Sequence, residues 1–496
     1  MNTTSKERWY SGITKYQWLV LVIALIGWMF DIFEGQIFVA SMNEAMPSFL
    51  TGFEGAERVA KAEFYNSVAL VSFLLGGTLG GVVFGMMSDR IGRKKTMAYS
   101  ILFYSFFTWM TAFSQAWWHL ALLRFFVAIG VGGQWAVASA FVAETFPNKA
   151  RAHAASIFHA FGSLGTLLAA LVGTLILGNA VIVAWCNTSP LMTWSHNLFD
   201  PVTIPWRLCF ALGLLPSILV FFIFFWLKEP ESWTAARERS EKDAKQKTGV
   251  IADLFHKDTI RSTLVGVALA GIGMATFWGV HVRGKDTMRL AGERQLAEMV
   301  PQLQPPNLDK TVQELEAKFD ENQKESLYKW EESVKKVREQ TLKRWEMLGM
   351  VISTLGLLVG QLMFGPLSQR IGRKNTFVFF HVGAFLISLV VFQWVTEVGW
   401  LFVLLPIFGF FTAGMHAGYA VYFPELFPTR LRGTGTGFCF NMGRFLASPF
   451  LLMTGWMVSW GGFTLMGALT VLSFLYLLGP VAILFAKETK GQELME

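Results

Sequence analysis

The sequence predicts an all-helical membrane protein with twelve transmembrane helices in two halves of six, for three reasons. Of the 496 residues, 53% are apolar and 16% are charged, whereas soluble globular proteins carry about 25% charged residues. The apolar residues form twelve runs of roughly 20 residues or more, which is enough to cross the hydrocarbon core as helices. Finally, the basic segment at residues 85–96 returns at 365–376 with eight of twelve positions identical, which predicts two similar halves.

The apolar runs define the expected organisation of the chain. Their length predicts helices, because the strands of a membrane barrel are about 10 residues long and alternate in polarity. We expect the spans at residues 16–42, 64–87, 95–115, 117–141, 152–178, 206–227, 261–283, 346–368, 375–395, 398–422, 432–457 and 463–486. The predicted units are an N-terminal half at 1–228, a cytoplasmic linker at 229–260 and a C-terminal half at 261–496, which holds an outer insertion at 284–345.

The distribution of Lys and Arg predicts the orientation. Cytoplasmic loops of membrane proteins carry an excess of these residues. Here they gather in the N-terminal segment, the two repeated turns, the linker and the C-terminal segment, while the short loops on the other side hold only Arg58 and Lys61. We therefore expect a multi-pass protein of the cell membrane with both termini in the cytoplasm.

Composition also excludes several functions. The net charge of +7 does not indicate nucleic acid as a partner, because the cations lie in short loops between apolar runs. Three cysteines offer neither a disulfide framework nor the spacing of a metal site. The chain shows no phosphate-binding Gly-Lys-Ser/Thr loop and no catalytic triad spacing, so we expect neither an enzyme nor a cofactor.

The insertion is predicted to be helical. Apolar residues recur at steps of three and four between Val312 and Trp345, as on one face of an amphipathic helix. Pro301, Pro305 and Pro306 indicate a break before it. A passive cap or self-association surface is the simpler expectation, and a role in handling substrate is the alternative.

The repeated basic turn is a candidate gate. Glycine allows close approach of the backbone, and Asp89 can meet a helix N-terminus or an arginine. Contacts of this kind, made in one conformation and broken in another, would latch the cytoplasmic side; alternatively, the cations only fix topology. Gln369 replaces Asp89 in the second copy, so an ionic contact is not possible there. The gating candidates are Gly85, Asp89, Arg90, Gly92, Arg93, Glu144, Arg151, Gly365, Arg370, Gly372, Arg373, Glu425 and Arg432.

A second repeat leads to a family resemblance. Residues 143–151 match 424–432, and each copy precedes the fifth helix of its half. With the double turn and the Arg-x-x-x-x-x-Gly-x-Gly-Gly pattern of residues 124–133, the chain resembles the major facilitator superfamily over nearly its whole length, the insertion excepted. This resemblance implies the major facilitator fold, in which helices 1, 4, 7 and 10 line a central cavity.

Two segments resemble one group within that superfamily. Asp31-Ile-Phe-Glu34 is similar to the Asp-x-x-Asp pattern of proton symporters for aromatic acids, sialic acid and related organic acids, although that group more often carries Asp at the position of Glu34. Residues 424–444 resemble the same group and the neighbouring sugar- and niacin-type porters.

The charged residues of helices 1 and 4 are candidates for proton coupling. A charged side chain at mid-membrane costs about 2.5–3.5 kcal/mol on insertion scales, so it needs a partner or a role. Asp31 and Glu34 lie three residues apart on one helix face, and Arg124 is expected at a comparable depth. A static ion pair between the two helices is one interpretation. Two acids within reach of one arginine leave a carboxylate that can bind a proton, which favours coupling.

Further polar and aromatic residues are candidates for binding substrate. They are Gln134, Trp278, Gln361, His416, Tyr419, Asn441 and Arg444. For most of them, hydrogen bonding or packing between helices is the simpler expectation. Arg444 is different because it needs an anion, either a substrate carboxylate or an acid on a neighbouring helix. His159 and His381 are expected to be structural.

The predicted function is proton-coupled symport of a small organic acid or sugar-like solute by alternating access. Facilitated uniport or export is the alternative within transport, and a transporter-like membrane sensor is the alternative from another class. The expected partners are the substrate, protons and the lipid bilayer, and the chain is expected to act as a monomer. The sequence does not identify the substrate.

Overall fold

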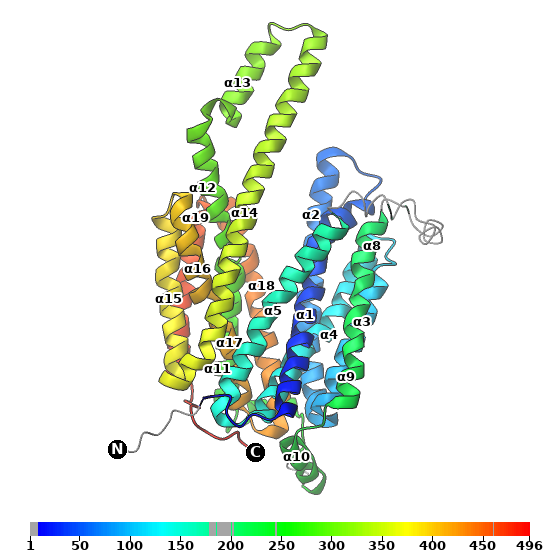
Figure 1. Cartoon of the computed structure of the whole chain (residues 1–496), viewed down its shortest axis with the longest axis vertical. Helices are drawn as coiled ribbons and strands as arrows, with labels where there is room; N and C mark the ends of the chain where they lie inside the picture. The colour runs from blue at the N-terminus through cyan, green and yellow to red at the C-terminus, as the bar shows by residue number, and fades with distance from the viewer. Residues whose placement is uncertain (1–7, 178–184, 186–199, 201–202, 244–245, 460) are drawn as a thin grey trace.

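The computed structural model describes residues 8–177, 185, 200, 203–243, 246–459 and 461–496. Within these ranges the regular structure consists of α-helices with short 3₁₀ and π-helical turns, and it contains no β-strand. Figure 1 shows the helices running side by side along the long axis of the molecule. The all-helical prediction is therefore confirmed for the described part of the chain.

The first helices form what we call the N-terminal group. Its members are α1 (Lys15–Ser48), α2 (Gly55–Ile91), α3 (Arg93–Thr111), α4 (Trp117–Thr145), α5 (Asn148–Ile176), α8 (Ile204–Ala211), the 3₁₀ turn η3 (Leu212–Ser217) and α9 (Ile218–Trp226). A connecting segment follows, with α10 (Glu231–Lys242) and the 3₁₀ turn η5 (Ile251–Phe255).

The remaining helices form what we call the C-terminal group. They are α11 (Ile260–Thr276), the π-helical turn η6 (Phe277–His281), α12 (Gly284–Met299), η7 (Pro301–Leu303), α13 (Pro305–Glu316), α14 (Glu321–Ile371), α15 (Arg373–Gln393), α16 (Val398–Gly414), α17 (His416–Tyr422), η8 (Phe423–Leu426), η9 (Thr429–Leu431), α18 (Arg432–Ser459), α19 (Leu465–Ser473), η10 (Phe474–Leu477) and α20 (Leu478–Leu484).

Each predicted span overlaps helical structure within the described part of the chain. Among the described residues, ten helices are long and apolar enough to cross a membrane. The predicted runs 95–115 and 432–457 fall largely on α3 and α18, which are not among these ten. Both helices are less apolar: α3 begins with three cations, and α18 carries glycines, threonines, Asn441 and Arg444.

Glycines bring the helices of each group into backbone contact. A Cβ at Gly80 of α2 would lie 1.9 Å from the carbonyl oxygen of Ile129 on α4. In the C-terminal group, a Cβ at Gly356 of α14 would lie 1.9 Å from the carbonyl oxygen of Pro406 on α16. Any larger residue at either glycine would force the two helices apart, as expected for small residues at helix interfaces in membranes.

The insertion forms a helical projection. Figure 1 shows α12, α13 and the start of α14 extending beyond the other helices, at the end opposite the two basic turns. Part of the predicted apolar stripe is buried: Val312 and Leu327 pack with Leu308. Trp330 and Val337, which the stripe also included, are exposed. α14 continues without a break from the projection into the predicted eighth span.

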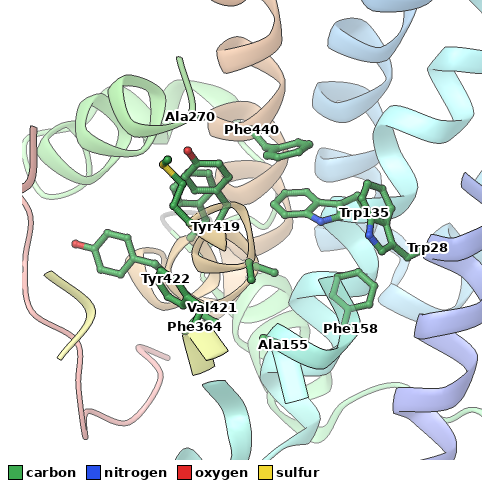
Figure 2. Packing of buried hydrophobic residues seen from close by; sticks show 14 of the residues in the cluster. Trp28, Trp135, Ala155, Phe158, Ala270, Phe364, Tyr419, Val421, Tyr422 and Phe440 are labelled. Atoms are coloured by element: carbon green, nitrogen blue, oxygen red, sulfur yellow. The ribbon is translucent and has the colours of Figure 1, made fainter. Parts of the chain in front are cut away.

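We call the end of the molecule that carries residues 85–96 and 365–376 the basic face. The start of α1 and the C-terminal residue lie at this same end (Figure 1). Near it, the two groups pack through aromatic rings: Trp135 of α4 stacks on Phe440 of α18 with ring centroids 3.8 Å apart (Figure 2). The Ser139 hydroxyl also donates a hydrogen bond to the carbonyl oxygen of Ala420 at 3.2 Å.

Candidate functional site

The two acids of α1 are buried, and the Tyr104 phenol and the Thr108 hydroxyl of α3 lie beside them without reaching hydrogen-bond geometry. Asp31 is 1% exposed and Glu34 is 0% exposed. In the described part of the chain, none of their four carboxylate oxygens has a hydrogen-bond partner. Buried polar groups normally do have partners, and each exception in a native structure needs an explanation. The phenol of Tyr104 on α3 lies beside the Asp31 carboxylate.

Arg124 of α4 contacts Glu34. Its Nη1 donates to the backbone carbonyl of Glu34 at 3.0 Å, and its Nη2 donates to the Thr108 hydroxyl at 3.4 Å. Three aromatic rings surround the guanidinium at 5.2 to 6.0 Å, those of Phe38, Phe73 and Phe210. Arg124 therefore belongs with Glu34 in the interior of the N-terminal group, and it makes no hydrogen bond to the Asp31 carboxylate.

Arg444 of α18 reaches into the N-terminal group. Its Nη1 donates to Asn441 Oδ1 at 3.3 Å, and its guanidinium carbon lies 4.9 Å from the centre of the Phe440 ring. The same Nη1 lies 3.1 Å from where a Cβ of Gly77 on α2 would sit. The guanidinium and the Asp31 carboxylate attract one another electrostatically. The sequence analysis looked for an acid on neighbouring helices, and the structure places one on α1.

Helix register gives Asp31 and Arg444 the same depth. Nε2 of Gln134 on α4 lies 2.9 Å from a Cβ built at Gly27, which is one turn before Asp31. Nδ2 of Asn441, one turn before Arg444, donates to the carbonyl oxygen of Gly132 on α4 at 3.3 Å. One turn farther from the basic face, the two helices therefore carry Asp31 and Arg444 at one level.

The other substrate candidates make contacts between helices. Asn441 also bonds within α18, and Gln134 accepts a hydrogen bond from Ser100 at 2.8 Å. Gln361 Nε2 donates to the carbonyl oxygen of Ala413 at 3.4 Å. The Tyr419 hydroxyl donates to the carbonyl oxygen of Leu269 at 3.0 Å. These contacts fit the simpler expectation of packing, while a role in binding substrate stays a prediction.

Two candidates lie in or beside the π-helical turn η6, because the His416 ring packs against Phe277 of that turn with centroids 5.1 Å apart. Trp278 lies within the turn and is half-buried. Nδ1 of His416 lies 3.1 Å from the carbonyl oxygen of Ala413, and its buried Nε2 has no partner in the described part of the chain. Single π-helical turns occur frequently at functional sites.

The sequence analysis missed His281, which is buried in the same turn. Its Nδ1 lies 2.8 Å from the Thr412 hydroxyl, which donates in turn to the carbonyl oxygen of Phe408. The sequence carries no signal for this turn, because apolar periodicity does not distinguish one π-helical turn from α-helix. His159, expected to be structural, accepts a hydrogen bond from Trp135 Nε1 at 3.0 Å.

At the basic face, Asp89 meets both predicted kinds of partner. Its carboxylate accepts hydrogen bonds from the backbone N–H groups of Gly433 at 3.0 Å and Thr434 at 2.7 Å, in the first turn of α18. The Thr434 hydroxyl adds a third hydrogen bond at 2.6 Å. Asp89 also pairs with Arg93 at 2.5 Å. A helix N-terminus favours an anion, so one fully buried carboxylate joins the two groups.

Glu144 extends this network. It pairs with Arg93 of its own group at 2.8 Å and with Arg432 of the other group at 2.7 Å. Arg93 also donates to the carbonyl oxygen of Thr429 at 3.0 Å. All of these charged side chains are buried, and truncation of one partner in a buried pair typically costs about 3–5 kcal/mol. The network therefore holds the two groups together at the basic face.

The second turn makes its ionic contacts inside its own group. Arg373 pairs with Glu425 at 2.9 Å, and Glu425 accepts a hydrogen bond from the Thr489 hydroxyl at 2.6 Å. Gln369 Nε2 donates to the carbonyl oxygen of Asn148 on α5 at 3.1 Å, which does cross between the groups. Gly365 lies against α5, where its Cβ would meet the carbonyl oxygen of Ala152 at 2.5 Å.

Two glutamates that the sequence analysis missed cap the helices after the turns. Glu229 accepts hydrogen bonds from the backbone N–H groups of Arg93 and Lys94 at 2.7 and 3.2 Å, and Glu488 does the same for Arg373 and Lys374 at 2.9 and 3.1 Å. Burial raises the pKa of Glu229, and the N–H groups that it accepts partly offset this. Each of these glutamates follows the last helix of its group, so the cap is a third feature that the two groups share.

The remaining gate candidates hold the connecting segment and the C-terminal segment. Arg90 donates to the carbonyl oxygen of Gly249 at 3.1 Å. Arg151 donates to the carbonyl oxygens of Ala143 and Gln492. The Arg370 carbonyl accepts a hydrogen bond from Lys490 at 2.8 Å. Gly92 and Gly372 adopt φ values of +113° and +95°, which only glycine adopts readily.

Comparison with known proteins identifies the family of the chain. A family model described as Major Facilitator Superfamily matches residues 18–286 and 346–493. The interval between these ranges corresponds closely to the insertion predicted at 284–345.

Three known proteins illustrate the likeness. The cis,cis-muconate transport protein of Acinetobacter baylyi is 25% identical over 441 residues, which cover 86% of this chain and 88% of that protein. The niacin transporter NiaP of the same species is 26% identical over 494 residues, with 97% and 96% coverage. The solved structure of the proton:xylose symporter XylE aligns with a TM-score of 0.63 at 16% identity, covering 97% of this chain and 98% of that one.

Proposed function

Because the chain belongs to the Major Facilitator Superfamily and is a multi-pass membrane transporter, we propose that it carries a small organic acid together with protons. The N-terminal and C-terminal groups are the two six-helix halves of this proposal, and they rock against one another to give alternating access. The basic face and both termini lie in the cytoplasm, and the membrane is the cell membrane.

Arg444 supports an acid as the substrate. It is half-buried at the junction of the groups, and its one hydrogen bond to a side chain in the described structure goes to Asn441 at 3.3 Å. A cation at mid-membrane needs an anion, and a carboxylate makes strong charge-assisted hydrogen bonds with a guanidinium. Muconate, niacin and sialic acid, named for relatives of this chain, all carry a carboxylate.

Asp31 and Glu34 support coupling to protons, and this is the observation that carries the proposal. A buried carboxylate without a hydrogen bond is costly when it is ionised. Protonation removes that cost, so each acid can bind a proton in one state of the transport cycle and release it in another. In this proposal, Arg124 keeps its contact with Glu34 and sets the affinity of that acid for a proton.

Transport in proteoliposomes tests the function. Counterflow of nicotinate, cis,cis-muconate or N-acetylneuraminate is expected for the wild-type protein, after a thermal-shift screen has shown which of the three binds. An inward proton gradient should drive accumulation. Asp31→Asn should abolish this accumulation while exchange of preloaded substrate continues. Glu44→Gln, which changes an exposed acid on the same helix, is the matched control and should behave as wild type.

Three results would contradict the proposal. Uphill accumulation that persists in Asp31→Asn would remove Asp31 from coupling. Absence of counterflow for every acid, combined with counterflow of a sugar, would replace the acid with a sugar-like substrate. Binding without any counterflow would favour a membrane sensor.

A further inference from the structure

The C-terminal segment of the chain crosses the basic face below the junction of the two groups. Figure 1 shows its red trace passing under the ends of the helices there. Two contacts attach the start of this segment to the C-terminal group. The Glu488 carboxylate accepts a hydrogen bond from the first backbone N–H of α15 at 2.9 Å, and the hydroxyl of the buried Thr489 donates to the Glu425 carboxylate at 2.6 Å. The segment is therefore anchored on the C-terminal group.

Residues 492–496, which we call the strap, then contact the N-terminal group. The backbone carbonyl oxygen of Gln492 accepts hydrogen bonds from Asn148 Nδ2 at 3.1 Å and from Arg151 Nη1 at 3.5 Å. Arg151 also lies 3.9 Å from the Glu493 carboxylate. Both donors belong to the first turn of α5, so the strap leaves its own group and is bonded to the other one.

The far end of the strap returns to the C-terminal group. The backbone carbonyl oxygen of Met495 accepts hydrogen bonds from Arg432 Nη2 at 2.8 Å and from the backbone N–H of Thr429 at 3.1 Å. Through its Nη1, the same arginine pairs with Glu144 of the N-terminal group at 2.7 Å. The strap therefore lies directly below the buried ionic network that joins the two groups.

The strap is too short to stay bonded on both sides when the groups separate. Three peptide units join Gln492 to Met495, and they span about 11 Å at most when fully extended. Their partners on α5 and α18 belong to groups that move apart in the proposed rocking motion. Because Glu488 and Met495 hold the strap on the C-terminal group, the hydrogen bonds to α5 are the ones that break. The contact with α5 thus exists only while the basic face is closed.

We propose that residues 492–496 form an autoinhibitory strap, which holds the basic face closed by bonding α5 from an anchor on the C-terminal group. Its acceptors are backbone carbonyl oxygens of an exposed segment, in which Gln492, Met495 and Glu496 are all accessible to solvent. Asp89, in contrast, is fully buried. Release of the strap uncovers only groups that water can solvate, so this part of the closure can be regulated from the side of the basic face. The inference depends on the rocking motion and on neither substrate nor protons.

Alkylation of a single cysteine tests the strap in the whole protein. The three native cysteines are replaced by alanine, and Ser139→Cys places the probe between the groups, where Ser139 is buried. Deletion of residues 492–496 leaves the anchor intact and should raise the alkylation rate about fivefold, the equivalent of one ordinary hydrogen bond. Asn148→Ala should raise it about threefold, because this variant loses the amide donor and keeps the backbone carbonyl that accepts from Gln369.

Combination of the two changes distinguishes a strap from a segment that only packs on its own group. If Asn148 acts through the strap, Asn148→Ala should add nothing to the alkylation rate once residues 492–496 are deleted. Asn375→Ala is the matched control, because it removes an asparagine hydrogen bond at the same face but within one helix. This variant should leave the rate unchanged.

Two outcomes would overturn the strap. One is an unchanged alkylation rate after the deletion, and the other is an effect of Asn148→Ala that persists in full when the strap is absent. If the deletion lowers the melting temperature, Asn148→Ala in the intact chain decides, and an unchanged rate in that variant overturns the proposal. Absence of transport for all three acids would remove the acid function and leave the strap standing, because alkylation requires no substrate.

Discussion

The two basic turns share eight of twelve residues but make different contacts. Each turn has a glycine at positive φ and an arginine that pairs with a glutamate of the same group, Glu144 or Glu425. In each, a second glutamate caps the helix that follows the turn. The first turn also places the Asp89 carboxylate on the N-terminus of α18 in the other group. The second turn places the neutral Gln369 amide on a backbone carbonyl of α5.

This difference makes the first turn the stronger connection between the two groups at the basic face. Asp89 accepts three hydrogen bonds from the C-terminal group and pairs with Arg93 inside a buried network. Gln369 donates one hydrogen bond between neutral groups. Hydrogen bonds to charged groups contribute about 1.5–3 kcal/mol each, against about 0.5–1.5 kcal/mol for neutral ones. In the second turn, the repeated arginine and glutamate stabilise their own group. In the first turn, Arg93 and Glu144 also contact the other group, and Asp89 adds its three hydrogen bonds to that connection.

Asp89→Asn is expected to have the largest effect. It removes the charge and places an amide among N–H donors, so the basic face should open more often. A cysteine at Ser139, which is buried between the groups, reports this opening when the native cysteines are replaced by alanine. Its rate of alkylation should rise at least about tenfold, the equivalent of one charged hydrogen bond.

Glu144→Gln and Glu425→Gln form the next pair. Glu144 pairs with Arg432 across the junction, and Glu425 pairs with Arg373 within one group. Glu144→Gln should raise the alkylation rate several-fold, and Glu425→Gln should lower the melting temperature with little change in alkylation. An equal increase in the alkylation rate in both variants would mean that the Glu425 network also holds the basic face closed. That result would contradict the difference between the two turns.

Gln369→Ala should have the smallest effect. It loses one neutral hydrogen bond of about 1 kcal/mol, so alkylation of the cysteine at Ser139 should rise by about fivefold or less. Gln369→Asp sharpens the test, because its carboxylate would face the carbonyl oxygen of Asn148 and should open the face more than alanine does. If Gln369→Ala raised the alkylation rate more than Asp89→Asn does, the second turn would hold the basic face closed more strongly than the first.

Part of the candidate site could be predicted from the sequence because it depends on short segments. Helical structure overlaps each predicted run in the described part of the chain, and ten of these helices are long and apolar enough to cross a membrane. A long apolar segment must satisfy its own backbone hydrogen bonds in lipid. The repeated turns marked the basic face, and an acid between glycine and arginine indicated a contact with a helix N-terminus, which Asp89 makes. Spacing within one helix also placed Asp31 and Glu34 together.

Partners on different helices depended on the tertiary structure. The sequence analysis joined Asp31 to Arg124 by depth, but Arg124 donates to the backbone carbonyl of Glu34 instead. The carboxylates of Asp31 and Glu34 lie one helical turn apart, so depth alone cannot distinguish them. Which arginine reaches which acid follows from the contacts of α2, α4 and α18 at Gly77, Gly132 and Asn441. Hydropathy and spacing determined which segments are helices and where their charges lie, whereas the faces that meet were decided only when the helices packed.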